Sequence, residues 1–301
     1  MHLLTLHWND ERPALQYRPA LAAPAIAHWE LISGAPLALH LSSEKYCIGY
    51  YDFVQRQKVP CPQQRRLEGR YVQCVPCQRQ EVTFYTFTGI AADPQAAEAY
   101  LVTQPHQAYL NLFGHDLLKV GVAAEGRKLR RTLEQGALAS LFFAQANGNA
   151  IRELERYISR ELGVRDRITT LQKIKRLAQQ PTAKHAADLL GRMAEQIAGQ
   201  VPPELRGYLR ADAEFHFHRA KYHLQLPPEL GAIPYIHQVT PSDTYAGYIR
   251  GIVGNLLVLE AGDRGLYVLP IKLLQGYCLT VAATLADMHV RHAPRVVTFE
   301  P

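Results

Sequence analysis

The chain has 301 residues, of which 48% are hydrophobic and 20% are charged, a composition typical of folded globular proteins rather than disordered ones. No stretch approaches the roughly 18 consecutive apolar residues of a membrane-spanning helix, so no membrane partner is expected. Residues 1–6 are too short a stretch for the core of a signal peptide and lack a basic leader, and acidic residues soon follow, so we expect a cytoplasmic protein.

The first region, residues 1–105, is expected to be rich in β-strands. Residues 28–42 and 82–88 alternate between apolar and polar side chains, which predicts a strand in each. Between them lies a segment rich in arginine, glutamine and proline, with little apolar periodicity. A short helix is expected after Asp93, which can cap it, with Pro94 at its first position.

Four of the five cysteines lie in that segment and suggest a metal site. Cys74 and Cys77 are separated by two residues, a spacing that lets both thiolates bind one tetrahedral zinc ion. Cys47 and Cys61, with 13 residues between them, would supply the other two ligands. A closed site of four cysteines would fold the segment and perform no chemistry. A redox-active CxxC pair and four unligated thiols are the alternatives.

The central region begins with a predicted hairpin. Apolar runs at residues 108–112 and 117–122 read as two strands, and Gly114 lies in the short connection between them. Helices are expected further on, at residues 127–135, 138–146, 150–162 and 167–180. The third of these is strongly amphipathic, with Asn149 as its expected cap and Gly163 after its end.

One acidic residue falls on the apolar face of the third helix. At about 100° per residue, Glu155 lies within the stripe formed by Ile151, Leu154 and Ile158. An acid on a buried face costs several kcal/mol of desolvation unless a cation or a hydrogen-bond donor meets it. Glu155 is therefore expected to have a partner, either a metal ion or an arginine.

Positive charge is concentrated in this same region. Residues 119–176 contain 13 lysines and arginines against six acidic residues, a local net charge of +7, whereas the whole chain carries +6. Localised positive charge is typical of a surface that binds a polyanion, and solvated helix faces with incidental arginines are the alternative. The side chains expected to contact phosphates are Arg127, Lys128, Arg130, Arg152 and Arg156.

Residues 181–230 show helical patterns interrupted by prolines, and the tail is again β-rich. Strands are expected at 248–259 and 266–269, with residues 262–265 as the turn of a second hairpin.

Most of the chain resembles the family catalogued as domain of unknown function 2797. The resemblance covers residues 40–280, and three motifs carry it. These motifs are Cys47-Ile48-Gly49-Tyr50 followed by three cysteines, Lys119-Val120-Gly121-Val122, and Arg131-Thr132-Leu133-Glu134-Gln135-Gly136-Ala137. The tail around Gly251-Ile252-Val253-Gly254 also fits.

Within that span, residues 106–180 resemble the GIY-YIG nuclease domain. In such nucleases a glutamate binds a divalent ion, a tyrosine helps to activate water and an arginine steadies the transition-state phosphate. By motif these roles would fall to Glu155, Tyr109 and Arg131, with Mg²⁺ or Mn²⁺ as the ion. Periodicity does not choose cleanly among Arg127, Arg130 and Arg131 for the last role.

The second motif of this chain departs from the GIY-YIG pattern, because a lysine stands at position 119 where a tyrosine is expected. Lys119 can neutralise a phosphate, but it cannot replace a phenol in proton relay unless its pKa is lowered. Binding of nucleic acid is therefore a firmer expectation than its cleavage.

Together these features predict an α+β protein in three parts. Residues 1–105 form a β-rich region with a four-cysteine zinc site, 106–180 a GIY-YIG-like antiparallel sheet with helices, and 181–301 a helical linker and a β-rich end. The expected function is binding of DNA or RNA through the basic domain. A divalent-metal-dependent nuclease is the second hypothesis, and a protein-interaction scaffold is the third.

Overall fold

The computed structural model describes residues 1–9, 11–227, 233–262, 265–282 and 296–297. The chain divides into two compact units, one formed by residues 1–100 with 234–301 and the other by residues 101–233. Both units combine helices with mainly antiparallel sheet, which confirms the α+β class. The two terminal stretches that read as β-rich contribute their strands to one and the same sheet.

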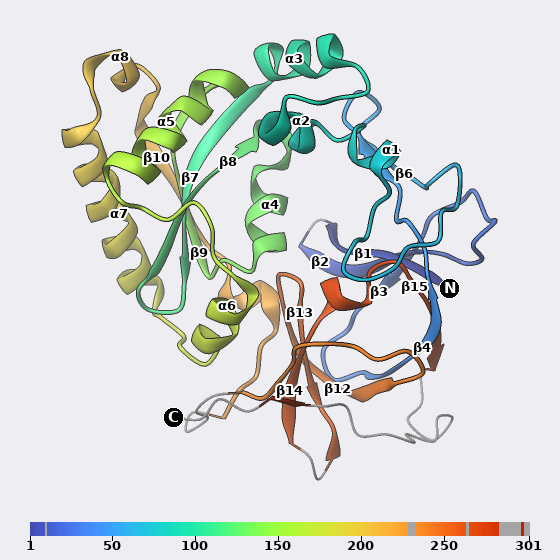
Figure 1. Cartoon of the computed structure of the whole chain (residues 1–301). Coiled ribbons are helices and arrows are strands. Elements are labelled where there is room, and N and C mark those ends of the chain that lie inside the picture. The colour runs from blue at the N-terminus through green and yellow to red at the C-terminus, as the bar shows by residue number, and fades with distance from the viewer. Residues whose placement is uncertain (10, 228–232, 263–264, 283–295, 298–301) are drawn as a thin grey trace. The chain divides into compact units, whose positions relative to one another are not determined.

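The sheet of the first unit has ten strands in the order β16-β11-β14-β13-β12-β4-β15-β1-β2-β3 (Figure 1). Its strands are β1 (His2–Asn9), β2 (Arg12–Arg18), β3 (Ala27–Glu30), β4 (Pro36–Lys45), β11 (Tyr235–Ile236), β12 (Thr244–Val253), β13 (Leu256–Glu260), β14 (Leu266–Pro270), β15 (Tyr277–Ala282) and β16 (Val296–Val297). A separate two-stranded hairpin pairs β5 (Tyr50–Asp52) with β6 (Gln57–Val59).

Strand β4 shows why the two ends of the chain fold together. It lies between β12 and β15, so the N-terminal Leu39 pairs with Tyr245 on one side and with Val281 on the other. Trp8 of β1 is 1% exposed, and its indole N–H donates to the backbone oxygen of Gly254 at 2.9 Å. The largest apolar side chain of the strand is thereby buried with its polar atom satisfied.

Residues 82–88, predicted as a strand, form a helix instead. The helices of this unit are α1 (Val75–Gln78), α2 (Val82–Thr88) and most of α3 (Pro94–Thr103). Gly89 ends α2 in the left-handed conformation, and its N–H donates to Tyr85 O at 2.8 Å. The β-branched and aromatic residues of this stretch favour strands, but local helical hydrogen bonds override that weak preference.

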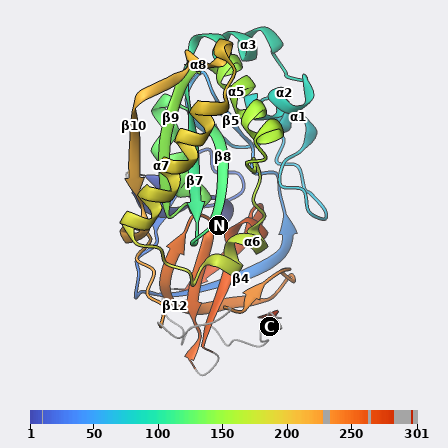
Figure 2. The same ribbon diagram turned by 90° about the vertical axis from the view of Figure 1, so that its left-hand side faces the viewer.

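The second unit contains a four-stranded antiparallel sheet in the order β10-β9-β7-β8. Its elements are β7 (Pro105–Phe113), β8 (Leu117–Ala124), α4 (Lys128–Gln135), β9 (Ala139–Asn147), α5 (Gly148–Glu161), α6 (Thr170–Arg176), α7 (Ala183–Gln200), α8 (Pro203–Arg206) and β10 (Leu209–Phe217). Helices α5 and α7 cover one face of the sheet and α4 lies against the other (Figures 1 and 2).

The predicted hairpin at the start of this unit is confirmed as β7 and β8, with Phe113 opposite Leu117 and Gly114 in the left-handed region. The predicted helix at 150–162 is confirmed as α5, although its cap is Asn147, whose side chain accepts from Ala150 N, rather than Asn149. Apolar side chains from both helices and from the sheet share one core; they include Leu110, Val120, Leu141, Ile151, Leu154 and Leu190.

Two parts of the sequence-based assignment in this unit are wrong. Residues 138–146 form β9 rather than a helix, because this short apolar run becomes a central strand buried on both faces, which periodicity alone cannot distinguish from a buried helix. Residues 209–217, within a stretch read as helical, form β10. In the tail, the single strand predicted at 248–259 is wrong, because a turn at 254–255 divides it into the paired strands β12 and β13. The predicted hairpin with the strand at 266–269 is confirmed as β13–β14, although residues 263–264 lie outside the described residues.

Among the residues that the structure describes, no helix combines the length and apolar character required to span a bilayer.

Candidate metal centre and nucleic-acid interface

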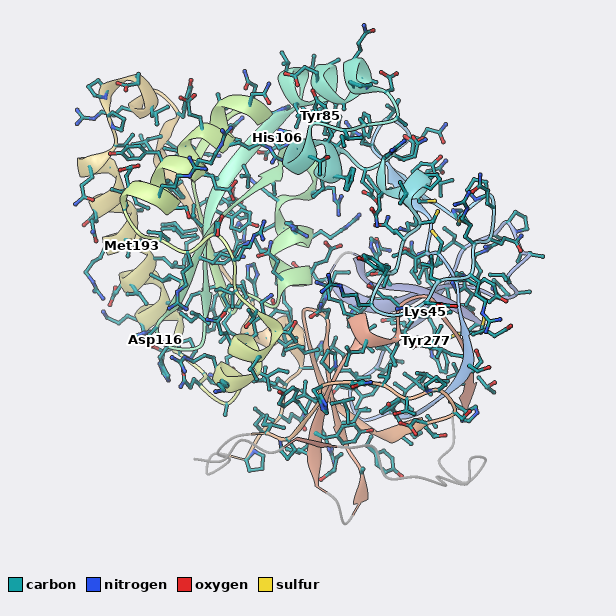
Figure 3. All side chains as sticks on the ribbon, viewed as in Figure 1. Lys45, Tyr85, His106, Asp116, Met193 and Tyr277 are labelled. Carbon is teal, nitrogen blue, oxygen red and sulfur yellow. The ribbon has the colours of Figure 1, made fainter. Side chains whose placement is uncertain are left out.

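Four cysteines form a buried cluster in the first unit, as their spacing predicted. The Sγ atoms of Cys47, Cys61, Cys74 and Cys77 all lie within 4.8 Å of one another, and each residue is at most 6% exposed. The sulfurs of Cys61 and Cys74 are 3.9 Å apart. Zn–S bonds of about 2.3 Å in a tetrahedron place the sulfurs about 3.8 Å apart, so this grouping can hold a zinc ion. Figure 3 shows the side chains of the described residues as sticks, with sulfur atoms in yellow.

The local backbone explains how the four thiols meet. Hairpin β5–β6 carries the chain from Cys47 to Cys61, and α1 begins directly after Cys74. The backbone N–H groups of Gly49 and Cys74 donate to Cys47 Sγ at 3.4 and 3.2 Å. A hydrogen bond with the Cys77 thiol, together with these N–H groups, holds the pKa of Cys47 well below its ordinary value. The cluster therefore favours a thiolate at this position.

Gly49 is required by the geometry of this turn. Its φ is +76°, and a Cβ atom there would lie 1.9 Å from the backbone oxygen of Val59 on the opposite strand. Only glycine permits both the left-handed conformation and this close approach of two backbone segments.

Two cations lie near the cysteine cluster. Arg18 is 3% exposed, its Nε donates to Ala23 O at 2.8 Å, and burial lowers its pKa while the charge of Cys61 raises it. Burial lowers the pKa of Lys58, whereas the charges of Glu81, Cys47 and Cys77 raise it. Four thiolates around one Zn²⁺ carry a net charge of −2, which two nearby cations would offset.

The second candidate site lies on the sheet of the other unit and begins with a cross-strand pair. Tyr109 of β7 stands opposite Gly121 of β8. A Cβ atom on Gly121 would lie 2.6 Å from both Cζ and Oη of Tyr109, so the ring occupies the space that any other side chain would fill. The glycine of the Lys119-Val120-Gly121 motif therefore makes room for the tyrosine.

Cationic side chains from three elements gather around Glu155 of α5. Burial raises the pKa of this carboxyl, and Lys119 of β8, Arg152 of α5 and Arg131 of α4 oppose the rise, while Asp166 adds to it. Lys119, Arg131, Arg152 and Glu155 are called the cationic centre below. Its three positive charges outweigh the carboxylates of Glu155 and the nearby Asp166, which favours an anionic ligand.

Lys119 is the most perturbed member of the cationic centre. Its pKa is lowered to about 8, first by burial and then by Arg131, although Glu155 and Asp166 raise it. An ammonium with this pKa is mostly protonated at neutral pH and loses its charge in mildly alkaline solution. The structure thus supplies the lowered pKa that a role for this lysine in proton transfer would need.

Tyr109 is buried and interacts electrostatically with Arg131 and Glu155 of the cationic centre. It is 1% exposed; burial raises its pKa, whereas the charge of Arg131 and a hydrogen bond from Gln135 lower it. The structure therefore brings Tyr109, Lys119, Arg131 and Glu155 within electrostatic range of one another. The tyrosine contacts protein rather than solvent, whereas Arg131 is exposed.

The other cations predicted to contact phosphates differ in their exposure and in whether a carboxylate already pairs with them. Lys128 bonds to Glu125 at 3.1 Å and to Glu214 at 2.5 Å, so two carboxylates already neutralise it. Arg127 lies 3.7 Å from Glu134. Arg130 is half-buried on α4, and Arg156 is exposed on α5, where its Nε donates to Arg152 O at 3.3 Å.

Two residues near the cationic centre, Asp166 and Gln135, were not predicted from the sequence. Asp166 follows α5 in a loop and lies close enough to act on both Lys119 and Glu155. Gln135 ends α4 and donates from Nε2 to Tyr109 Oη at 2.7 Å. Nothing in the local sequence marks Gln135 as a functional residue, although it lies three residues before the buried Leu138. Strand alternation, by contrast, could have placed Asn111 on the same face of the sheet as Tyr109, because it lies two residues after it.

Comparison with known proteins gives one result. A search of curated proteins found no match to this chain, and neither did a search of solved structures. A family model described as a protein of unknown function, DUF2797, matches residues 34–279. This match spans both compact units, the cysteine cluster and the cationic centre, and the chain therefore belongs to the DUF2797 family.

Proposed function

We propose that this protein binds nucleic acid and that the cationic centre contacts its phosphate backbone. The observation that carries the proposal is the convergence of Lys119, Arg131 and Arg152, from three different elements, on one half-buried carboxylate. Such an arrangement retains net positive charge at a fixed place on a rigid sheet. Phosphates are bound by lysine and arginine at sites of this kind.

The likeness of residues 106–180 to the GIY-YIG domain supports the same assignment. The two strands, the arginine-bearing helix and the later helix with its glutamate occur in the expected order, as β7, β8, α4 and α5. Arg156 extends the positive charge along α5, while the paired Lys128 and Arg127 contribute less. We therefore expect Arg131, Lys119 and Arg152 to dominate binding.

Fluorescence anisotropy with labelled fragments tests this proposal. Single-stranded and duplex DNA and RNA are titrated with the full chain at about 50 mM and at about 200 mM salt. Binding that weakens by tenfold or more between these conditions is expected, because neutralised phosphates release counterions. Absence of binding at the lower salt, or affinity that does not depend on salt, would contradict the proposal.

We further propose that the four-cysteine cluster holds one zinc ion with a structural role. The site would use all four coordination positions for sulfur, leaving none for a substrate. Zinc would fix the chain from Cys47 to Cys77, including hairpin β5–β6 and α1. Elemental analysis of the freshly purified protein should find about one zinc per chain. A protein that contains no metal and keeps the same fold would contradict this role.

A second candidate function is hydrolysis of phosphodiesters, favoured by the two acids, Glu155 and Asp166, that interact electrostatically, with Arg131 acting on the first. Carboxylate oxygens suit Mg²⁺ or Mn²⁺, and such an ion would supply Lewis-acid activation of the phosphate. Arg131 would stabilise the charge that develops there, and Lys119, with its low pKa, is the accessible proton-transfer group.

Cleavage assays with Mg²⁺ or Mn²⁺ compare wild type with Glu155→Gln, which removes the charge and keeps the shape. Loss of cleavage in the variant, with binding retained, supports the nuclease. Equal cleavage in both proteins assigns the activity to a contaminant.

A further inference from the structure

A chain of buried polar side chains runs between α4 and the sheet toward the cationic centre. It consists of His218, Ser140, Asn111 and Gln135, and it ends at Tyr109. Ser140 Oγ lies 2.9 Å from His218 Nε2 and 2.7 Å from Asn111 Oδ1, and Gln135 Nε2 lies 2.7 Å from Tyr109 Oη. The first three residues are completely buried. Polar groups buried this deeply must satisfy one another, so donors and acceptors have to alternate along the chain.

Lys119 fixes the direction of this chain. Its Nζ lies 3.4 Å from Gln135 Oε1, and an ammonium can only donate a hydrogen bond. The amide oxygen of Gln135 must therefore face the lysine, which turns Nε2 toward Tyr109. The phenol oxygen accepts at this contact, so the Tyr109 proton remains available for another acceptor.

The donors and acceptors of the remaining hydrogen bonds are determined in the same way. Asn111 Nδ2 lies 3.4 Å from Gln135 Oε1 and donates to it, so Oδ1 accepts the proton of Ser140. Ser140 must then accept from His218, which places the histidine proton on Nε2. Burial lowers the pKa of His218 to about 3, with Lys221 and His216 adding to the effect, so the ring is neutral at physiological pH. Its other nitrogen, Nδ1, is buried without a partner among the described residues.

We infer that Gln135 is a positioning residue that holds the Lys119 ammonium and the Tyr109 hydroxyl in a fixed relation, at the end of a hydrogen-bond chain whose donors all point from His218 toward Tyr109. Hydrogen bonds oriented in one direction strengthen one another. One N–H of Lys119 is used by Gln135, which leaves two for a phosphate oxygen. The consequence for binding rests on the proposed function, whereas the orientation itself does not.

Gln135→Glu tests the orientation directly. The variant is nearly isosteric, but its carboxylate has no N–H to give to Tyr109 and adds a negative charge beside Lys119. Titration followed by ¹³C NMR, with Lys119 assigned by its loss in Lys119→Gln, should show the lysine pKa rising from about 8 by about one unit or more. The Tyr109 Cζ resonance should shift as the phenol turns from acceptor to donor.

Gln145→Glu provides the matched control, because this exposed glutamine lies on β9 of the same unit and undergoes the same charge change. Neither the Lys119 pKa nor the Tyr109 resonance should move in it. Unchanged Lys119 and Tyr109 signals in Gln135→Glu would overturn the inference.

The wild-type protein offers a test if Gln135→Glu does not fold. The side-chain amide protons of Gln135 should show stronger nuclear Overhauser effects to the Tyr109 ring than to the Lys119 methylenes. The opposite pattern would place the amide the other way round and overturn the inference.

These measurements contain no nucleic acid, so their outcome is independent of whether the proposed function is right. Where wild type binds nucleic acid, Gln135→Glu should lower its affinity by roughly tenfold and by more than Gln145→Glu does. Equal affinities for the two variants would overturn the role of Gln135 in binding. If wild type does not bind, only the proposed function falls.

Discussion

The cysteine cluster and the cationic centre are held in place by different forces. Among the described residues, only two partly buried apolar side chains, Tyr50 and Leu67, pack against the four cysteines. The cationic centre instead joins side chains of β8, α4 and α5, and β8 and α5 belong to one sheet-and-helix unit with a large apolar core. The segment around the cysteine cluster therefore depends on a bound metal for its shape, whereas packing gives the cationic centre its shape. Loss of a cysteine should therefore change folding, and loss of a surface cation should change binding.

The largest effect is expected for Cys74→Ser. Removal of one of four ligands should lower zinc affinity by more than about 100-fold, since even outer-shell partners are worth roughly 10- to 100-fold. The segment between Cys47 and Cys77 should then exchange its amide hydrogens rapidly. Zinc content and hydrogen exchange measure both effects. Cys278→Ser is the control, because this cysteine lies outside the cluster. Identical zinc content in the two variants would show that the cluster does not bind the metal.

A smaller effect, still on folding, is expected for Gly49→Ala. The new Cβ meets the backbone of Val59, which cannot move cheaply, so the free energy of unfolding should fall by about 3 kcal/mol. Gly69→Ala shares the positive φ but has nothing within 4 Å of its Cβ, so it should lose only about 1 kcal/mol. Denaturant titration of zinc-loaded protein compares them. Equal losses would mean that backbone conformation alone explains the need for glycine.

A loss of stability is also expected for Gly121→Ala, near the cationic centre. Its Cβ would displace the buried Tyr109 ring, and an overpacked site of this kind should cost about 2 kcal/mol of stability. Gly126→Ala, with nothing near its Cβ, should change stability little. If both variants unfold at the same denaturant concentration, the Tyr109 ring can move aside and its packing against Gly121 does not stabilise the fold.

The smallest effect is a pH dependence of binding. The pKa of Lys119 is about 8, so its charge is lost between pH 7 and pH 9, and nucleic-acid affinity should fall by up to about tenfold over this range. Lys119→Arg keeps its charge and should remove that decrease.

The direction in which stability changes with pH shows whether weaker binding at high pH results from Lys119 or from unfolding. The folded-state pKa of Lys119 lies below the ordinary value of 10.5, so the unfolded chain binds more protons between pH 8 and 10.5. This group therefore makes the fold more stable as pH rises through that window. Weaker binding accompanied by loss of stability at pH 9 would point to some other group.

The parts of the structure that could be predicted from sequence are those fixed by local spacing. The CxxC pair, the hairpin at Gly114 and the amphipathic stripe of α5 each follow from residues close together in the chain. Strand β9 could not be recognised, because an apolar run buried on both faces has no distinguishing period. The insertion of β4 between β12 and β15 depends on pairing across almost the whole chain.

The same contrast holds within the cationic centre. Glu155 could be predicted because an acid interrupts an apolar stripe. Tyr109 and Lys119 could be predicted from their positions in the motifs. Gln135 and Asp166 could not be predicted, because the residues that they interact with lie on other elements, far away in the sequence. Contacts of this kind appear only once the tertiary fold is known.

The salt dependence of nucleic-acid binding by a charge-reversed protein tests the central claim most directly. Lys119→Glu combined with Arg131→Glu should reduce the slope of log affinity against log salt by about 0.9 for each phosphate of duplex DNA that the variant no longer neutralises. Lys184→Glu combined with Arg192→Glu makes the same charge change on α7, which packs on β7, β9 and β10. We predict a large decrease of affinity and slope in the first double variant and a small one in the second. Equal decreases in both would show that binding follows net charge and not the cationic centre.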